Sequence, residues 1–260
     1  MRALTLKQGA LTLPDLIRRL SLLSGILGAA AFLAVITGTD NFKFNDLYQL
    51  IKGFHKDSIQ SVIFWEVRLP RAILAAAVGG ALGICGAVLQ TLLRNPLAEP
   101  FLLGISSGAA IGAYAAILLG FQFSLFGFSA ISVLALLGGL AAIALVYRVA
   151  CVGGRLPTLT LILAGVVVNA MFSSVILFAN SVFEAGRVMT VMSWLLGHIS
   201  GLEKPTLALV VIFIFSASAL LFLHARHLNG MVLGEGPAQS LGIPAEALKK
   251  RLLVITTALT

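Results

Sequence analysis

Residues 68–112 read RLPRAILAAAVGGALGICGAVLQTLLRNPLAEPFLLGISSGAAIG and carry the clearest structural signal in the chain. Two apolar runs are joined by the short polar segment 94–100. The first run ends at Leu93, and the second continues beyond Gly112 to residue 119. Long apolar runs without strict alternation are typical of helices that cross a membrane in about 20 residues. The stretch therefore predicts a membrane hairpin of two helices.

The composition indicates that the whole chain is embedded in a membrane. Of its 260 residues, 59% are hydrophobic and only 11% are charged, whereas a soluble domain carries about 25% charged residues. Lipid offers no hydrogen bonds to the backbone, so the spans must be helices or a closed barrel. Because the apolar runs are long and continuous, we predict an all-α, polytopic integral membrane protein. Its net charge of +8 is explained by basic loops rather than by binding of nucleic acid.

Apolar runs recur along the chain and define a single transmembrane domain over residues 1–260. Six membrane helices are expected between residues 20 and 223, at 20–37, 71–93, 101–119, 125–147, 158–180 and 206–223. Residues 38–70 are mixed and predict a folded external loop with a short amphipathic helix near 44–54. The basic N-terminus followed by an apolar run is also compatible with a signal peptide. The length of that run favours a retained first helix.

A seventh apolar segment begins near Arg251 and reaches Thr260, the last residue given. Residues 252–260 are too few to cross about 30 Å of hydrocarbon at about 1.5 Å per residue. We therefore expect a chain that is truncated in its seventh helix, or that needs a partner to complete the fold. On this expectation, the 260-residue chain alone would not support transport.

The distribution of charge predicts the orientation. With a cytoplasmic N-terminus, the inner segments are 1–19, 94–100, 148–157 and 224–251. They hold more than half of the 18 basic residues and fewer than half of the 10 acidic residues. Basic loops stay in the cytoplasm, so we predict a multi-pass protein of the bacterial or archaeal plasma membrane, with segment 224–251 as its longest cytoplasmic loop.

Several functional classes are disfavoured by what the apolar runs lack. The predicted spans 71–93 (after Arg71), 101–119, 125–147, 158–180 and 206–223 contain no Asp, Glu, Lys, Arg or His. Ion-coupled transporters commonly carry such groups within the membrane, and a metal-dependent enzyme needs clustered ligands. The chain also lacks a Gly-Lys pair and hence a P-loop for nucleotide hydrolysis. We predict no catalytic residue, no cofactor and no metal site, with Cys85 and Cys151 as ordinary thiols.

Small residues recur at intervals of four in the hairpin. Gly79 and Gly83 belong to the first apolar run, and Gly104, Gly108 and Gly112 to the second. Residues four apart share one helix face, and small side chains there let helices approach closely. These five glycines are therefore predicted to pack helices together.

The loop 224–251 predicts a compact structure rather than a simple linker. A short helix over 237–241 lies between Gly236 and Gly242, and a second is expected over 245–251 after Pro244. Glu246 would lie in the first turn of that second helix, and Lys249 in its last turn, where each charge suits the helix dipole. A solvated loop is the alternative.

Four colinear motifs resemble the FecCD family of permease subunits, which serve ABC importers of iron-siderophores, haem and vitamin B12. They are Arg68-Leu-Pro-Arg71, the segment from Gly86-Ala-Val-Leu-Gln90 through Asn95-Pro-Leu-Ala-Glu-Pro100 to Leu103-Gly-Ile-Ser-Ser-Gly108, Trp194-Leu-Leu-Gly197 with Ser200-Gly201, and Leu233-Gly-Glu235 with Ala238-Gln-Ser-Leu-Gly242. The resemblance covers about residues 60–260 and implies a type II importer permease. The family continues past the position of Thr260, which is the departure from its pattern.

The resemblance also implies roles for individual residues. Arg68 and Arg71 match arginines that dock an external substrate-binding protein, while Asn95, Leu97 and Thr158 match a cytoplasmic gate. The expected partners are that binding protein, an ATPase subunit, a second permease subunit (identical or not) and the lipid bilayer. The residues that match the ATPase-coupling segment are Leu233, Gly234, Glu235, Ala238, Gln239, Ser240, Leu241 and Gly242. The alternatives are an ion-coupled secondary transporter, a membrane enzyme or assembly protein, or a fragment of a permease that does not transport.

Overall fold

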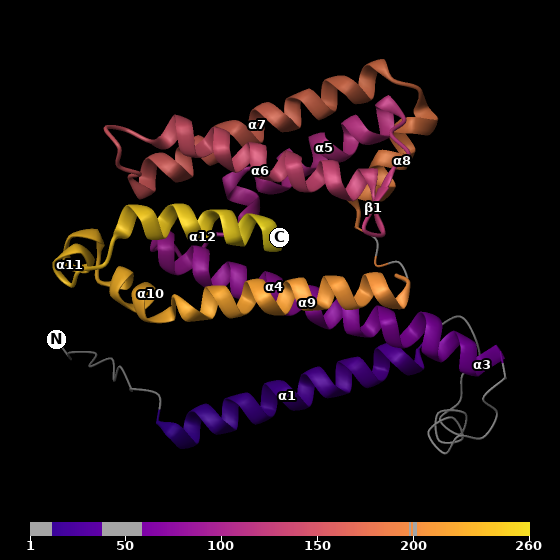
Figure 1. Ribbon diagram of the computed structural model, residues 1–260, viewed down its shortest axis with the longest axis horizontal. Coiled ribbons are helices and arrows are strands. Elements are labelled where there is room, and N and C mark those ends of the chain that lie inside the picture. Colours follow the sequence, from indigo (N-terminus) through magenta and orange to yellow (C-terminus); the bar gives the residue numbers. More distant parts are fainter. Residues whose placement is uncertain (1–11, 38–58, 198, 200–201) are drawn as a thin grey trace, which may run out of the picture. The chain divides into compact units, whose positions relative to one another are not determined.

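The computed structural model describes residues 12–37, 59–197, 199 and 202–260, which are mostly helical (Figure 1). The amphipathic helix predicted near 44–54 lies outside these residues. The chain divides into two compact units, Met1–Ala76 and Ala77–Thr260. An all-α, polytopic membrane fold, as predicted from composition, is confirmed.

The first unit contains α1 (Leu13–Ile36) and the start of a long continuous helix. α1 begins seven residues earlier than predicted, and Pro14 fits its first turn because that turn needs no backbone donor. None of its residues is buried, as expected of a helix surrounded by lipid. The long helix comprises α3 (Ile59–Val62), η1 (Ile63–Arg68) and α4 (Leu69–Leu93). The prediction of a loop over 38–70 is therefore wrong for residues 59–70, which are helical.

Pro70 explains the irregular turn η1 inside this helix. Proline has no N–H and its ring clashes with the carbonyl four residues earlier, which here belongs to Glu66. The chain widens to a π turn just before it, where the Leu69 N–H donates to the carbonyl of Phe64, five positions back. The helix continues without a break for 35 residues. At about 1.5 Å per residue this exceeds the hydrocarbon thickness by some 20 Å.

The second unit contains the rest of the fold. Its remaining elements are η2 (Pro100–Leu103), α5 (Ile105–Leu119), β1 (Ser124–Leu125), β2 (Phe128–Ser129), α6 (Ala130–Ala150), α7 (Thr158–Val182), α8 (Ala185–Leu195), α9 (Lys204–Leu223), α10 (Ala225–Val232), α11 (Glu235–Ser240) and α12 (Ala245–Leu259). The two strands pair antiparallel in a small hairpin before α6. That hairpin occupies the beginning of the predicted span 125–147, so the helix runs from 130 to 150 instead.

Five helices among the described residues are long and apolar enough to cross a membrane: α1, the helix Ile59–Leu93, α6, α7 and α9. The predicted crossing over 101–119 is interrupted. Gly104 has φ +74° and separates the 3-10 turn η2 from α5. α5 has 15 residues, or about 22 Å of helix, which is shorter than the hydrocarbon core.

Glycines allow α5 and its neighbours to pack at close range. A Cβ on Gly108 would lie 2.7 Å from the carbonyl oxygen of Gly138 in α6, and one on Gly112 would collide with the carbonyl of Leu134. Gly104 meets the backbone of α7 at Asn169. In contrast, a Cβ on Gly79 or Gly83 would meet no described atom within 4 Å. No described residue packs closely against these two glycines, so their part in helix packing stays a prediction.

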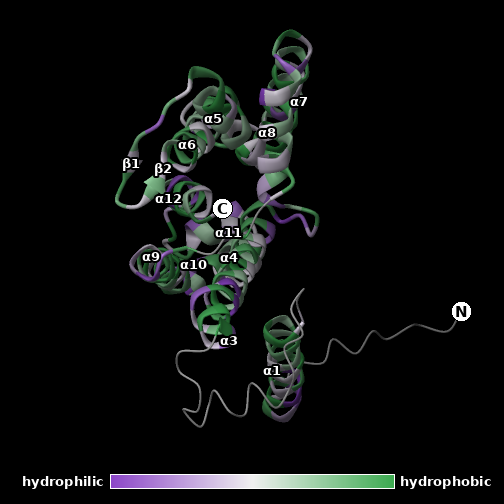
Figure 2. Ribbon diagram, turned by 90° about the vertical axis from the view of Figure 1, so that its right-hand side faces the viewer, coloured by the Kyte–Doolittle hydropathy of each residue, from purple (hydrophilic) through white to green (hydrophobic). Residues whose placement is uncertain are grey.

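The core of the second unit lies among α4, α6, α7, α9 and α12. The ribbons of its long helices are mostly hydrophobic in Figure 2. α12 contributes Leu248, Leu252, Leu253 and Thr256, which are all buried and recur every three or four residues. This stripe continues past residue 251, so the predicted short helix 245–251 and the start of the seventh span form one helix. The sequence reading also missed α10.

Candidate functional site

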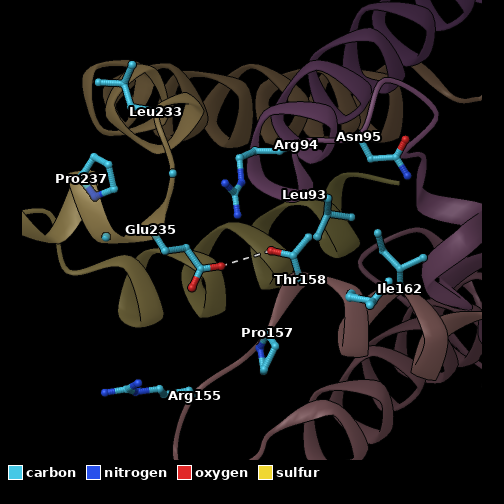
Figure 3. Close-up of a pocket in the computed structure, with 13 residues that line it drawn as sticks. Leu93, Arg94, Asn95, Arg155, Pro157, Thr158, Ile162, Leu233, Glu235 and Pro237 are labelled. Atoms are coloured by element: carbon cyan, nitrogen blue, oxygen red, sulfur yellow. Dashed lines mark hydrogen bonds between the residues drawn. The ribbon is translucent and has the colours of Figure 1, made fainter.

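One end of the second unit gathers three connecting segments around an open cavity of about 1030 Å³ (Figure 3). We call this cavity the loop pocket. The segments are the turn after α4, the connection between α6 and α7, and the residues that enter α11. The lining residues are Leu93, Arg94, Asn95, Arg155, Pro157, Thr158, Leu159, Ile162, Leu233, Gly234, Glu235, Gly236 and Pro237. Sequence positions as far apart as Leu93 and Pro237, 144 residues, therefore meet in one place.

Arg94 ends α4 in a conformation that usually belongs to glycine. Its φ is +47°, and the Asn95 N–H donates to the carbonyl of Gln90 while the Arg94 N–H donates to that of Thr91. These are the two hydrogen bonds of a Schellman cap, whose left-handed position disfavours a residue with a Cβ. A strained non-glycine residue at such a position suggests that its side chain has a role. The guanidinium of Arg94 points into the loop pocket (Figure 3).

The three predicted gate residues do not all meet. Asn95 and Thr158 both line the loop pocket. Asn95 also shapes its own turn, since its side-chain oxygen accepts the N–H of Leu97 at 2.9 Å. Leu97 does not line the pocket, and its side chain is 77% exposed. The structure therefore brings together two of the three residues.

The segment 233–242 divides into an outer and an inner side. Gly234 has φ +116°, which only glycine adopts readily, and a Cβ there would lie 3.3 Å from Nη1 of Arg94. Ala238 is fully buried inside the chain, whereas Leu241 is 65% exposed. The other predicted coupling residues with exposed side chains or backbone are Leu233, Gln239, Ser240 and Gly242. Ala238 is thus unavailable to a partner, contrary to the prediction.

Glu235 faces the interior as well, and it connects three elements. Its Oε1 atom lies 2.8 Å from Nζ of Lys249 in α12 and accepts a hydrogen bond of 3.2 Å from the hydroxyl of Thr158 (Figure 3). Glu246 lies nearby, with Oε1 3.3 Å from the same Nζ. Two carboxylates therefore share one ammonium group at the base of α11.

These neighbours shift the pKa of Glu235. Partial burial raises it, but the hydrogen bond and charge of Lys249, the hydroxyl of Thr158 and the charge of Arg94 together hold the pKa below its ordinary value of 4.5. Glu235 is therefore ionised at neutral pH and accepts hydrogen bonds from both partners.

Lys249 was expected in the last turn of a short helix, where its charge would suit the helix dipole. Its side chain is only 2% exposed, and its Nζ donates to the carbonyl of Leu156 at 2.6 Å. Residue 249 falls on the apolar stripe of α12, between Ala245 and Leu252 or Leu253. Its position on this apolar stripe could have identified Lys249 from the sequence as a buried charge, and a buried charge requires partners.

Arg68 and Arg71 lie in the first unit and differ in their surroundings. The Nη1 atom of Arg68 donates to the carbonyls of Val35 and Ile36 at 2.6 and 2.9 Å. These carbonyls end α1, where a cation is favourable. Arg71 is exposed on the following turn of helix. The two arginines were expected at the outer end of a helix but lie within the continuous helix Ile59–Leu93.

Known proteins resemble the chain over most of its length. The FecCD transport family matches residues 26–260. A cobalamin import system permease protein, BtuC of Halobacterium salinarum, is 38% identical over 200 residues, which are 76% of this chain and 53% of that protein. The vitamin B12 import permease BtuC of Klebsiella pneumoniae is 35% identical over 195 residues, covering 75% of this chain and 57% of the relative. The chain thus spans little more than half the length of these relatives.

A solved structure shares the fold. It is an inward-facing ABC transporter assigned to the metal-chelate type, with a TM-score of 0.75 and 27% identity. The match covers 95% of this chain and 73% of the other. Among the described residues, no group of three or more His, Cys, Asp and Glu side chains is placed to hold a metal ion. On the evidence of the family match and of these relatives, the chain belongs to the FecCD transport family.

Proposed function

We propose that the chain is the membrane-spanning permease subunit of a binding-protein-dependent ABC importer. Its substrate would be an iron chelate, such as a siderophore or haem, or a cobalamin-type compound. Membership of the FecCD transport family supports this function, and the relatives named as cobalamin import permeases support the substrate class. The structural neighbour of metal-chelate type agrees with a large chelated substrate.

The two-sided segment 233–242 is the observation that carries the proposal. A solvated loop would have no buried side, yet Ala238 is buried and the partly exposed Glu235 is bonded to Lys249 and Thr158, while Leu241 and Gln239 face outward. An exposed leucine on a firmly anchored short helix suits docking into a groove of a partner. We assign this surface to an ATPase subunit and therefore propose that α11 lies in the cytoplasm; the basic N-terminal segment supports a cytoplasmic N-terminus.

The remaining partners follow from the same proposal. Energy comes from ATP hydrolysis in the separate subunit, since the sequence contains no P-loop. A substrate-binding protein docks on the external side of the membrane through Arg71, with Arg68 beside it. A second permease subunit, identical or related, completes the pathway, and the loop pocket lies at the cytoplasmic mouth with Asn95 and Thr158 in its wall.

Reconstitution with the partner subunits tests the proposal. The permease should co-purify with an ATPase subunit, and binding protein loaded with a cobalamin or ferric siderophore should stimulate ATP hydrolysis and uptake into liposomes. Parallel liposomes with a sodium or proton gradient and no ATP provide the control. Uptake driven by a gradient alone would assign the chain to the secondary transporters, and absence of ATPase binding would contradict the proposal.

A further inference from the structure

Lys249 is a charge buried at the loop pocket end of the second unit. Its side chain is 2% exposed, and Lys249 lies in the second turn of α12. Removing an ammonium group from water is unfavourable unless acceptors replace the lost water. The neighbours of Lys249 must therefore stay in place for the fold to tolerate the charge.

Those neighbours come from three different segments. Glu235 at the start of α11 lies 2.8 Å from Nζ, the carbonyl oxygen of Leu156 before α7 lies 2.6 Å away, and Glu246 of α12 lies 3.3 Å away. Two of these groups also bind the segment at α7. Glu246 Oε2 accepts the Leu156 N–H at 2.8 Å, and Glu235 Oε1 accepts the Thr158 hydroxyl at 3.2 Å.

Groups from three segments contact the one ammonium group of Lys249, so a movement of one segment should affect the other two. α11 is a single short helix, with Glu235 at its base and Gln239 on its exposed side. A displacement of the exposed side moves Glu235 with it. If Glu235 left Lys249, the buried ammonium group would keep only Glu246 and the Leu156 carbonyl as partners, which is unfavourable for a charge removed from water. The favoured response is that α11, α12 and the first turn of α7 move together.

We propose that Lys249 is a positioning residue for transport, which locks α11 to the first turn of α7 so that a displacement of α11 reaches Thr158 and the mouth of the loop pocket. This inference rests on the proposed function, and it concerns the link behind the docking surface rather than the docking itself. Glu235 then belongs to the internal link and does not contact the ATPase.

Lys249→Met in the permease assembled with its ATPase tests the link, because methionine keeps the length of the side chain and removes the charge. Lys250→Met is the matched control, since Lys250 is the exposed next residue of the same helix. Coupling between two sites is commonly worth about 5- to 150-fold. We therefore expect substrate uptake per ATP hydrolysed to fall about tenfold or more in Lys249→Met, with ATPase binding retained and Lys250→Met unchanged.

A distance measurement separates a mechanical link from general loss of stability. Spin labels at Gly236 of α11 and at Leu159, both exposed, should keep a constant separation through the ATP cycle in the unmutated permease. In Lys249→Met the separation should change with nucleotide. If Lys249→Met does not fold, Glu235→Gln tests the same link between α11 and α7, because that variant leaves Lys249 paired with Glu246 and Leu156.

The outcomes distinguish this inference from the proposed function. Unchanged uptake per ATP in Lys249→Met, or in Glu235→Gln where the first variant fails, overturns the role of Lys249 while the function stands. A label separation that varies in the unmutated permease overturns it as well. If the unmutated chain does not bind an ATPase, that result would contradict both the proposed function and this inference.

Discussion

The Nζ atom of Lys249 lies 2.6 Å from the carbonyl oxygen of Leu156, although 93 positions separate the two residues. The N–H of Leu156 is also occupied, by Oε2 of Glu246 at 2.8 Å. Both backbone groups of one residue in the α6–α7 connection are therefore satisfied by side chains of α12. Buried backbone groups need such partners, so the position of this connection depends on α12.

Loss of the ammonium group should destabilise this end of the protein. Lys249→Met removes the donor that two carboxylates and the Leu156 carbonyl share, and breaking a fully buried pair costs about 3–5 kcal/mol. The cost here should be smaller, because Glu235 and Glu246 are 27% and 32% exposed and keep their hydrogen bonds from Thr158 and from the Leu156 N–H. Adding Glu235→Gln should cost less than the sum of the single changes, because one unpaired charge is removed. Hydrogen exchange of the amides in α11 and α12 measures both effects. Strictly additive costs would contradict the proposed network.

Acidification should weaken the network only at low pH. The pKa of Glu235 is held below its ordinary value of 4.5, so its contribution to stability is complete above that value and is lost as pH falls through the lower, folded-state pKa. Thermal unfolding of the unmutated chain and of Glu235→Gln provides the comparison. Their difference should be constant from neutral pH down to about 5 and shrink below 4.5. A difference that shrinks near neutral pH would show that the pKa is raised.

Two substitutions in the 233–242 segment should have different effects. Leu241 is 65% exposed, so Leu241→Asp should leave the fold intact and release the ATPase, because docking would bury an unpaired charge. Ala238 is fully buried, so Ala238→Asp should disrupt α11 itself. ATPase retention and thermal unfolding of the purified variants distinguish the cases. If Leu241→Asp retains the ATPase and transports normally, the segment is only a linker.

The glycines of α5 and α4 should differ in their tolerance of a methyl group. Gly112→Ala forces the Cβ against the carbonyl of Leu134 and should destabilise the α5–α6 pair by about 1–3 kcal/mol. Gly79→Ala meets no described atom within 4 Å and should stabilise its helix by about 0.5–1 kcal/mol. Denaturant unfolding in detergent measures both. A large loss with Gly79→Ala would reveal another surface packed on α4.

Arg71 is the cleaner test of docking by the binding protein. Arg71→Glu reverses an exposed charge, and because exposed ion pairs are worth about 0.2–1 kcal/mol, affinity should fall several-fold. Arg68→Glu would also remove the donor that caps α1 at Val35 and Ile36. Arg155→Glu, an exposed arginine in the wall of the loop pocket, is the control. Equal affinity of the Arg71→Glu and unmutated proteins, measured by surface binding, would refute this docking site.

Arg94→Gly should separate local strain from function. Glycine relieves the left-handed conformation at φ +47°, which costs an L-residue about 1–2 kcal/mol, so the turn after α4 should become more stable. The guanidinium beside Gly234 and Glu235 is lost at the same time. We expect a higher unfolding temperature with weaker transport. Unimpaired transport would show that the arginine has no role at the loop pocket.

Sequence periodicity and composition were sufficient for the general architecture. Apolar runs longer than about 18 residues have few alternatives to membrane helices, and α6, α7 and α9 lie close to their predicted positions. Predictions of helix boundaries from local sequence patterns were less accurate where two effects compete. A membrane helix was expected to begin at residue 71, yet a π turn accommodates Pro70 inside a helix that begins at Ile59.

The sequence by itself determined the membrane fold and the family motifs, since each depends on local composition or on a short pattern. Only the tertiary structure decided which charges are buried. Lys249 and Lys250 are adjacent and chemically identical, but one is enclosed by Glu235, Glu246 and Leu156 and the other is exposed. Likewise, Gly112 packs against α6 while Gly79 meets no described atom. Burial and close approach depend on contacts between segments distant in the chain, and a single sequence does not state which segments meet.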